Sequence, residues 1–488
     1  MVEQADYKQK YEESQLTIAT LKQELEALKK MIFGSRHERF HPDHTNPSQL
    51  PLDMACDSAL IAPVAGSQKI TYTRTTTTEQ KAHPVRMKLP EHLERREVVI
   101  EPTEDVSGLR RLGEEITEEL DYEPGKLFVR RIIRPRYVST DNQNFVIAPL
   151  VERPLPKAIA AAGLLTQIII DKYLDHLPLN RQVERLKREG ITLPYSTISD
   201  WVSATAKLLD PLYEALKKEL IGSDYLHVDE TPVKVLDKDK KGTTHRGYLW
   251  VYHNSLQDLV FFNYQMGRGR EGPSAMLQGF KGHLQTDGYS AYNIFSDKEG
   301  ITLFHCMAHA RRKFYEARDN DPGRASYVLS QIQLLYDIER RARGEFLSEQ
   351  EIYQLRQSEA LPILTSLGQW MQKAYREVLP KSAIGLALAY SITRWQELMI
   401  YATDGKLAID NNPVERSIRA VAVGRKNHLF CGSHDAAQRS ALLYSVTGTC
   451  KLHQINPFIY LKDVLTRIAM HPVNKISELL PHNWKPLQ

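Results

Sequence analysis

The chain has 488 residues, of which 42% are hydrophobic and 25% are charged, and its formal net charge at pH 7 is +4. This composition is ordinary for a soluble globular protein and excludes a collagen, a wholly disordered chain and a small disulfide scaffold. With about 150 residues per domain as a guide, the length predicts roughly three domains.

The cysteines and the apolar segments predict a cytoplasmic protein. Cys56, Cys306, Cys431 and Cys450 form no Cys-x-x-Cys pair, which indicates neither a disulfide framework nor a standard zinc ribbon. The longest apolar run, residues 158–170, is too short to span a bilayer. Acidic residues also stand where a signal peptide would have its apolar part. We therefore expect no membrane contact.

Residues 1–33 carry the clearest periodic pattern. Apolar side chains recur at alternating spacings of four and three, interrupted only by Ser14, at Tyr7, Tyr11, Ile18, Leu21, Leu25, Leu28 and Ile32. This heptad seam predicts a coiled-coil helix that pairs protomers, with a helix packed on its own chain as the alternative. Residues 34–92 are rich in Pro, Ser and Thr and are predicted to be a linker, partly disordered.

Residues 93–150 alternate in polarity and predict a small domain of short strands. Between Leu127 and Arg136, apolar residues stand among four arginines, which predicts strands with one basic face. A solvated sheet face without a partner is the alternative, and charge alone does not decide between them.

Residues 151–220 have a helical pattern. The segment 180–190 ends in Gly190, typical of a helix C-cap, and Ser196 is a candidate N-cap for the next helix. A helix, a glycine turn and a second helix resemble a helix-turn-helix motif that binds DNA, although many helical hairpins share this pattern. We take residues 180–205 as the candidate segment for reading a DNA sequence.

Residues 221–315 predict strands, a short helix and further strands, which is an α/β order. Two of the strand candidates lead into carboxylates, Asp229 and Asp287, and strand ends are where α/β proteins often place ligand sites. The pattern is helical from about 311 to 402 and largely helical from about 410 to 470. Within it, Asn412 as N-cap with Pro413 at the first helical position would put Glu415 in the first turn.

Asp229, Asp287 and Glu415 offer the chemistry that phosphoryl transfer with divalent metal ions needs. Mg²⁺ takes oxygen ligands, and two ions can activate the attacking oxygen and stabilise the leaving oxygen. Basic residues beside the third carboxylate are candidates for binding DNA phosphates, namely Arg416, Arg419, Arg425 and Lys426. Taken singly, each acid is more typical of a surface or capping residue, and Glu415 suits the helix dipole.

Several motifs in chain order carry a resemblance to a known family. HVDETPVKV, LQTDGYSAY, HCMAHARRKF and DNNPVERSIRAVAVGRKNHLFCGS resemble motifs of bacterial DDE transposases of the insertion-sequence 66 family. KYLDHLPLNRQ, the segment 196–201 and the N-terminal helix leading into FGSR resemble the same family. The resemblance covers nearly the whole chain, and its NNPVER…GRKN block is highly specific.

The resemblance implies a multidomain α/β plus α protein with an RNase H-like catalytic core, a helical insertion, an N-terminal coiled coil and a helical DNA-binding region. Asp229 would lie on the first core strand, Asp287 on the fourth and Glu415 on a later helix. The implied divisions are a core at 221–315, a helical insertion at 316–402, the glutamate helix at 403–435 and a C-terminal helical tail at 436–488.

The activity that the resemblance implies is DNA transposition: cleavage at the ends of an insertion sequence and transfer of the 3′-OH to target DNA, with Mg²⁺ or Mn²⁺ held by Asp229, Asp287 and Glu415. The implied partners are terminal-repeat and target DNA, a second copy of the chain, and accessory proteins of the same element, in the bacterial nucleoid. The alternative is a catalytically silent, domesticated transposase that only binds DNA.

Three features depart from this pattern or compete with it. The family usually carries two Cys-x-x-Cys pairs in the N-terminal third, but the matching places, 105–108 and 139–142, hold none, so we expect no zinc there. The run 267–272 (GRGREG) matches a dinucleotide-binding fingerprint, yet the helix after it is short, and we interpret the match as accidental. Cys306 and His309 could be half of a metal site, but no four ligands can be named, so we favour a buried cysteine and a structural or phosphate-contacting histidine.

Overall fold

The structure is a computed structural model that describes residues 89–487, apart from 92, 107–108, 124, 139–143 and 237–241. These residues belong to one compact unit, Val85–Gln488. The predicted coiled coil at 1–33 and nearly all of the predicted linker at 34–92 lie outside the described residues. So do residues 107–108 and all of 139–142, where related proteins would carry zinc ligands. Among the residues described, no helix is long and apolar enough to cross a membrane.

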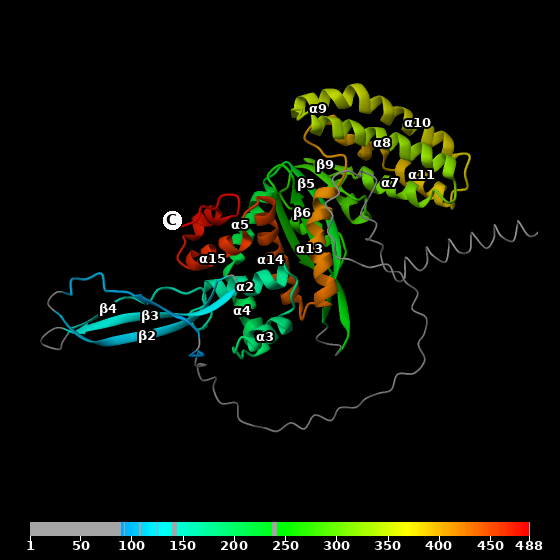
Figure 1. Ribbon diagram of the computed structural model, residues 1–488. Coiled ribbons are helices and arrows are strands. Elements are labelled where there is room, and N and C mark those ends of the chain that lie inside the picture. The colour runs from blue at the N-terminus through cyan, green and yellow to red at the C-terminus, as the bar shows by residue number, and fades with distance from the viewer. Residues whose placement is uncertain are drawn as a thin grey trace, which may run out of the picture. The chain divides into compact units, whose positions relative to one another are not determined.

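The first sheet is built around a long hairpin (Figure 1). Its strands are β1 (Arg95–Val99), β2 (Arg110–Glu123), β3 (Lys126–Val138) and β4 (Phe145–Ile147). β3 pairs with β2 and β4 in antiparallel fashion and with β1 in parallel. β2 and β3 have 14 and 13 residues, so the prediction of short strands is wrong for this pair.

Three of the four arginines of β3 form ion pairs with glutamates of the sheet. Arg131 lies 3.2 Å from Glu97 of β1, and Arg134 lies 3.2 Å from Glu115 of β2. The buried Glu119 carboxylate forms an ion pair with Arg130. Cross-strand glutamates therefore neutralise these arginines, and the predicted basic face is wrong because the sequence pattern did not show which strands would be neighbours.

Four helices follow: α2 (Ala162–Tyr173), α3 (Leu179–Arg188), α4 (Tyr195–Leu208) and α5 (Asp210–Ile221). Gly190, between α3 and α4, has a φ of 82°, a left-handed conformation that glycine adopts without steric cost. Ser196 is not the N-cap of α4: the N-cap is Pro194, two residues earlier, and Ser196 lies inside the helix. The helical hairpin itself is present, with its apolar residues Leu186, Ile198 and Trp201 buried.

The second sheet has five strands: β5 (Tyr225–Leu236), β6 (Thr244–Asn254), β7 (Leu259–Gln265), β8 (Gly282–Thr286) and β9 (Ile301–His305). Their order is β7-β6-β5-β8-β9. β6 is antiparallel to both of its neighbours, β5 and β7, whereas β8 pairs in parallel with both β5 and β9. Nearly continuous apolar runs in β5, β6 and β7 are buried, as expected for a sheet covered on both faces.

Two C-terminal helices pack on this sheet, α13 (Asn412–His428) and α14 (His434–Leu452), as Figure 1 shows. The Phe262 N–H of β7 donates a hydrogen bond of 2.8 Å to the Ser445 hydroxyl of α14. The prediction of a C-terminal tail at 436–488 is therefore wrong for α14, which is part of the core. The chain ends with α15 (Pro457–Arg467), which packs on α2, and the 3₁₀ segment Val473–Leu479.

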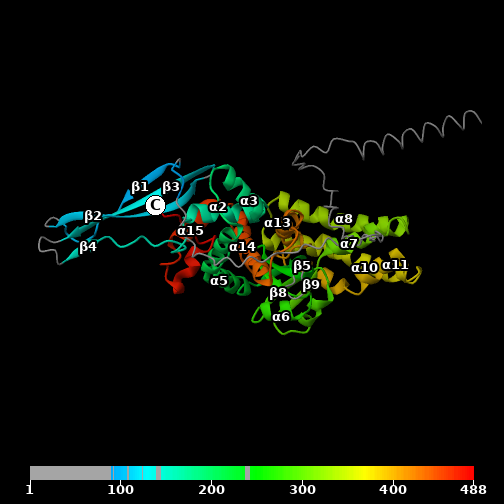
Figure 2. The same ribbon diagram turned by 90° about the horizontal axis from the view of Figure 1, so that it is seen from below.

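A second hydrophobic core belongs to the helices between the last strand and α13. They are α7 (Met307–Glu316), α8 (Pro322–Gly344), α9 (Glu349–Leu355), α10 (Leu361–Tyr375), α11 (Ala383–Ile392) and α12 (Trp395–Met399). Figure 2 shows α7, α8, α10 and α11 bundled together, in agreement with their mutual contacts. A π-helical turn, Arg356–Ala360, places the Arg356 guanidinium inside this bundle.

Candidate active site

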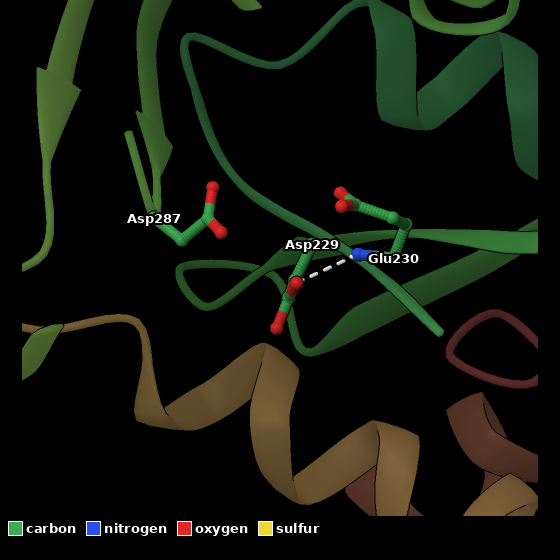
Figure 3. Close-up of side chains that lie close together, drawn as sticks. All are labelled: Asp229, Glu230 and Asp287. Atoms are coloured by element: carbon green, nitrogen blue, oxygen red, sulfur yellow. Dashed lines mark hydrogen bonds between the residues drawn. The ribbon is translucent and has the colours of Figure 1, made fainter. Parts of the chain in front are cut away.

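Two of the three predicted carboxylates meet at one edge of the second sheet. β5 and β8 are parallel neighbours, paired from Tyr225↔His283 to His227↔Gln285, so the residues that follow these pairs on the two strands lie side by side. The prediction that Asp229 stands at a strand end is wrong, because β5 stays paired with β6 and continues to Leu236. Asp229 follows the last of these pairs on β5, and Asp287 comes directly after β8. Carboxylate oxygens of Asp229, Asp287 and a third acid, Glu230, lie within 4.8 Å of one another (Figure 3).

Strand alternation sends Asp229 and Glu230 in different directions, as Figure 3 shows. Asp229 shares its face of the strand with His227, whose Nδ1 lies 3.0 Å from Oδ1 of Asn411, just before α13. Glu230 points to the opposite face, where the 3₁₀ segment η1 (Ser290–Phe295) packs. Asp229 therefore faces the helix that carries Glu415, and Glu230 does not.

Glu230 was not predicted as part of the site. Its Oε1 accepts a hydrogen bond of 2.7 Å from Nε of Arg268, and its Oε2 accepts one of 2.7 Å from the Tyr292 hydroxyl. These partners are distant in the sequence, and the adjacent Asp229 is the more conspicuous acid, so no sequence signal set Glu230 apart. With both oxygens engaged, Glu230 is less available to a metal ion than Asp229 or Asp287.

The DNNP segment fixes the start of α13 against the sheet. The Asn411 amide donates a hydrogen bond of 2.9 Å to the Val228 carbonyl of β5. The Asn412 N–H and side chain both donate to Asp410, at 3.1 and 2.7 Å. The N-cap is therefore Asn411, and the prediction of Asn412 is wrong by one residue, with Asn412 and Pro413 both inside the helix. Glu415 lies in the first turn as expected.

Glu415 approaches the two aspartates from α13 without joining their tightest cluster. Its Oε1 lies 3.9 Å from Nε2 of His309. Burial raises the pKa of Asp229, and the charges of Glu230, Asp287 and Glu415 raise it further. Carboxylates crowded in this way are stabilised by a divalent cation, and an all-oxygen set from Asp229, Asp287 and Glu415 suits Mg²⁺ or Mn²⁺.

Cys306 and His309 of the Cys-x-x-His pair have separate roles. Cys306 is fully buried at the N-cap of α7, and its Sγ accepts a hydrogen bond of 3.1 Å from the Asn411 N–H. Burial raises the pKa of this thiol, which suits a structural residue. His309 lies beside Glu415, and burial lowers its pKa although Asp287 and Glu415 act in the opposite direction. The Cys-x-x-His spacing was the signal that pointed to this histidine.

The four predicted phosphate-binding residues of α13 differ in accessibility. Arg416, Arg419 and Lys426 are exposed. Arg425 is partly buried, and its Nη1 donates a hydrogen bond of 2.7 Å to the Pro232 carbonyl of β5. Burial, and then the neighbouring Arg246, lower the pKa of Arg425. Arg425 therefore connects α13 to the sheet, and three of the four predicted phosphate-binding residues are exposed.

Comparisons with known proteins agree with the motifs. Residues 157–439 match the family described as Transposase IS66 family, residues 445–482 match the IS66 C-terminal element, and residues 20–98 match Transposase C of IS166 homeodomain.

Curated relatives extend the match along the chain. The uncharacterized protein y4hP of Sinorhizobium fredii is 32% identical over 96% of this chain and 89% of its own length. The uncharacterized protein y4jD of the same organism is 31% identical over 96% of this chain and 95% of its own length. A third, y4qI, is 32% identical over 81% of this chain and 76% of its own length.

Proposed function

Because the chain belongs to the IS66 transposase family, we propose that it is a DDE-type transposase that cuts DNA at the ends of its own insertion sequence and joins the released 3′-OH to target DNA. The observation that carries this proposal is the meeting of Asp229, within β5, and Asp287, at the end of the parallel neighbour β8, with Glu415 brought toward them by α13. The strand order β7-β6-β5-β8-β9 supports an RNase H-like core.

Asp229, Asp287 and Glu415 are the proposed ligands of Mg²⁺ or Mn²⁺. Such ions, when bound, activate the attacking oxygen and stabilise the leaving oxygen of an in-line displacement at phosphorus. The three side chains come from a strand, a strand end and a helix that are fastened to one another, so their geometry is set before DNA binds. Water attacks in the first step and the 3′-OH in the second, without a protein nucleophile, so catalysis consists of positioning and charge stabilisation.

Other parts of the chain have proposed roles in DNA binding. Arg416, Arg419 and Lys426 are exposed on α13 and suited to contact backbone phosphates, and Arg425 supports them through its bond to β5. The α3–α4 hairpin, which contains residues 180–205, is the proposed reader of the terminal repeats. The heptad segment at 1–33 would pair two protomers, which suits a reaction that joins two DNA ends, and accessory proteins of the element remain proposed partners in the bacterial nucleoid.

Metal dependence separates this transposase from a silent DNA-binding protein. We expect the full chain to cut and join labelled terminal-repeat DNA in Mg²⁺ or Mn²⁺ and to stop when EDTA removes the ion, because the carboxylates alone cannot stabilise a leaving oxygen. Gel analysis of the products measures both steps, and a binding assay runs beside it. Tight binding of the ends without any metal-dependent product, even with the accessory proteins added, would reject the enzyme in favour of the binding protein.

A further inference from the structure

The glycine-rich run that resembles a nucleotide fingerprint has another use in this fold. Residues 267–270 of this run lie in the loop between β7 and α6 (Glu271–Met276), and residues 271–272 begin α6, a helix of only six residues. Within the loop, Arg268 is held by Glu230 through the 2.7 Å bond from its Nε, and the Glu230 side chain is 0% exposed. A loop arginine is thus fastened to a fully buried carboxylate at the edge of the candidate active site.

A second contact fixes the plane of the guanidinium. Its central carbon lies 3.9 Å from the centre of the Tyr289 ring, and the Tyr289 hydroxyl donates a hydrogen bond of 3.1 Å to the Arg268 carbonyl. The Tyr289 N–H in turn donates a bond of 2.8 Å to Oδ1 of Asp287. Tyr289 therefore links Arg268 to Asp287, one of the proposed metal ligands.

Part of the Arg268 guanidinium can still donate hydrogen bonds to a ligand. The Arg268 side chain is 43% exposed, and its Nη1 has no partner among the residues that the structure describes. Burial alone would lower the pKa of Arg268, but Glu230, with smaller contributions from Tyr289 and Asp287, raises it overall. A cation held rigidly on one edge and open on the other is preorganised to bind an anion with planar, directional bonds.

We propose that Arg268 binds a backbone phosphate of the DNA strand being cut or joined, with Glu230 and Tyr289 as the residues that position it. This assignment rests on the proposed function, and it deepens it by adding a phosphate contact on the side of the carboxylates away from α13. It also gives Glu230 a role other than metal ligand, because one oxygen serves Arg268 and the other serves Tyr292.

Salt dependence of binding to terminal-repeat duplex tests the phosphate contact. In the full chain, Arg268→Gln is expected to reduce the slope of log affinity against log salt by about one, the value for one lost phosphate contact. The matched control is Arg318→Gln, since Arg318 also lies over a tyrosine ring, Tyr315, at 4.0 Å but has no carboxylate partner among the described residues. An unchanged slope for Arg268→Gln, or an equal loss in both variants, would overturn the proposal.

The positioning role of Glu230 has a separate readout. Glu230→Gln should keep the Mn²⁺ affinity measured by calorimetry while lowering strand joining by up to about 100-fold, because a misplaced binding group is that costly. A fall in Mn²⁺ affinity would identify Glu230 as a ligand and overturn its positioning role. The salt slope is measured by DNA binding and does not depend on cleavage or joining. A wild-type protein that never joins DNA would therefore reject the proposed function, while a smaller salt slope for Arg268→Gln would still support the phosphate contact.

Discussion

Replacing Asp287 with alanine is expected to lower cleavage and joining of terminal-repeat DNA by more than about 100-fold. Removing a group that only supports a metal ligand lowers metal affinity or activity about 10- to 100-fold, and Asp287 is a proposed ligand itself. Binding of the ends should remain, because Asp287 is not itself among the residues that we assign to DNA contacts. Quantified strand-transfer products and a gel-shift assay on the same preparations measure the two effects.

Asp297→Ala is the matched control, since Asp297 lies ten residues further on and is exposed in the turn after η1. It should leave both cleavage and binding unchanged. Glu415→Gln should reproduce the loss seen for Asp287→Ala, and it probes the member of the triad that approaches from α13. Full activity of Glu415→Gln would remove that residue from the triad, and full activity of Asp287→Ala would refute the site as a whole.

The second large effect concerns the stability of the helical bundle. Arg356 is 2% exposed, and its Nε and Nη2 donate to the two oxygens of Glu339 at 2.8 and 2.7 Å. Nη1 donates to the carbonyls of Tyr401 and Asp404 at 2.8 and 2.6 Å. Arg356→Ala would leave the Glu339 charge buried without a partner, and we expect this to lower the free energy of unfolding by about 3–5 kcal/mol. Urea unfolding followed by circular dichroism measures the change.

An exposed arginine of the same bundle provides the comparison. Arg340 pairs with Asp337 at 2.8 Å, but both side chains are about half exposed, so Arg340→Ala should cost under about 1 kcal/mol. Replacing both buried partners, as Arg356→Met with Glu339→Leu, should recover much of the loss, because no buried charge then remains. Equal destabilisation by Arg356→Ala and Arg340→Ala would contradict this view of the buried pair.

The sequence indicated the meeting of Asp229 and Asp287, because each follows an apolar run and these runs form parallel neighbouring strands. It did not indicate that the strand of Asp229 continues to Leu236. It could not indicate Glu230, whose partners Arg268 and Tyr292 are 38 and 62 residues away along the chain. Nor could it choose between Asn411 and Asn412 as N-cap. That choice depends on the bond from Asn411 to Val228, a contact across 183 residues.

The errors in the fold have similar physical causes. α14 is buried nearly all round from Ser440 to Thr447, and such a helix shows no one-sided apolar pattern that would predict its place in the core. The arginines of β3 looked like a basic face because their glutamate partners stand on β1 and on the distant parts of β2. The place of α14 and the pairing of the β3 arginines both depend on which elements become neighbours. Local periodicity does not encode that information.

The most direct test of the central claim compares two ends of the same DNA. Precut terminal-repeat duplexes that carry either a 3′-OH or a 3′-dideoxy end are incubated with the full chain, Mg²⁺ and a supercoiled target. We predict joined product from the 3′-OH end only, with no covalent protein–DNA adduct, because the 3′-OH is the nucleophile of the second step. Joining of the dideoxy end, a covalent adduct, or no joining of either end even with the accessory proteins added would contradict the assignment of a DDE-type transposase.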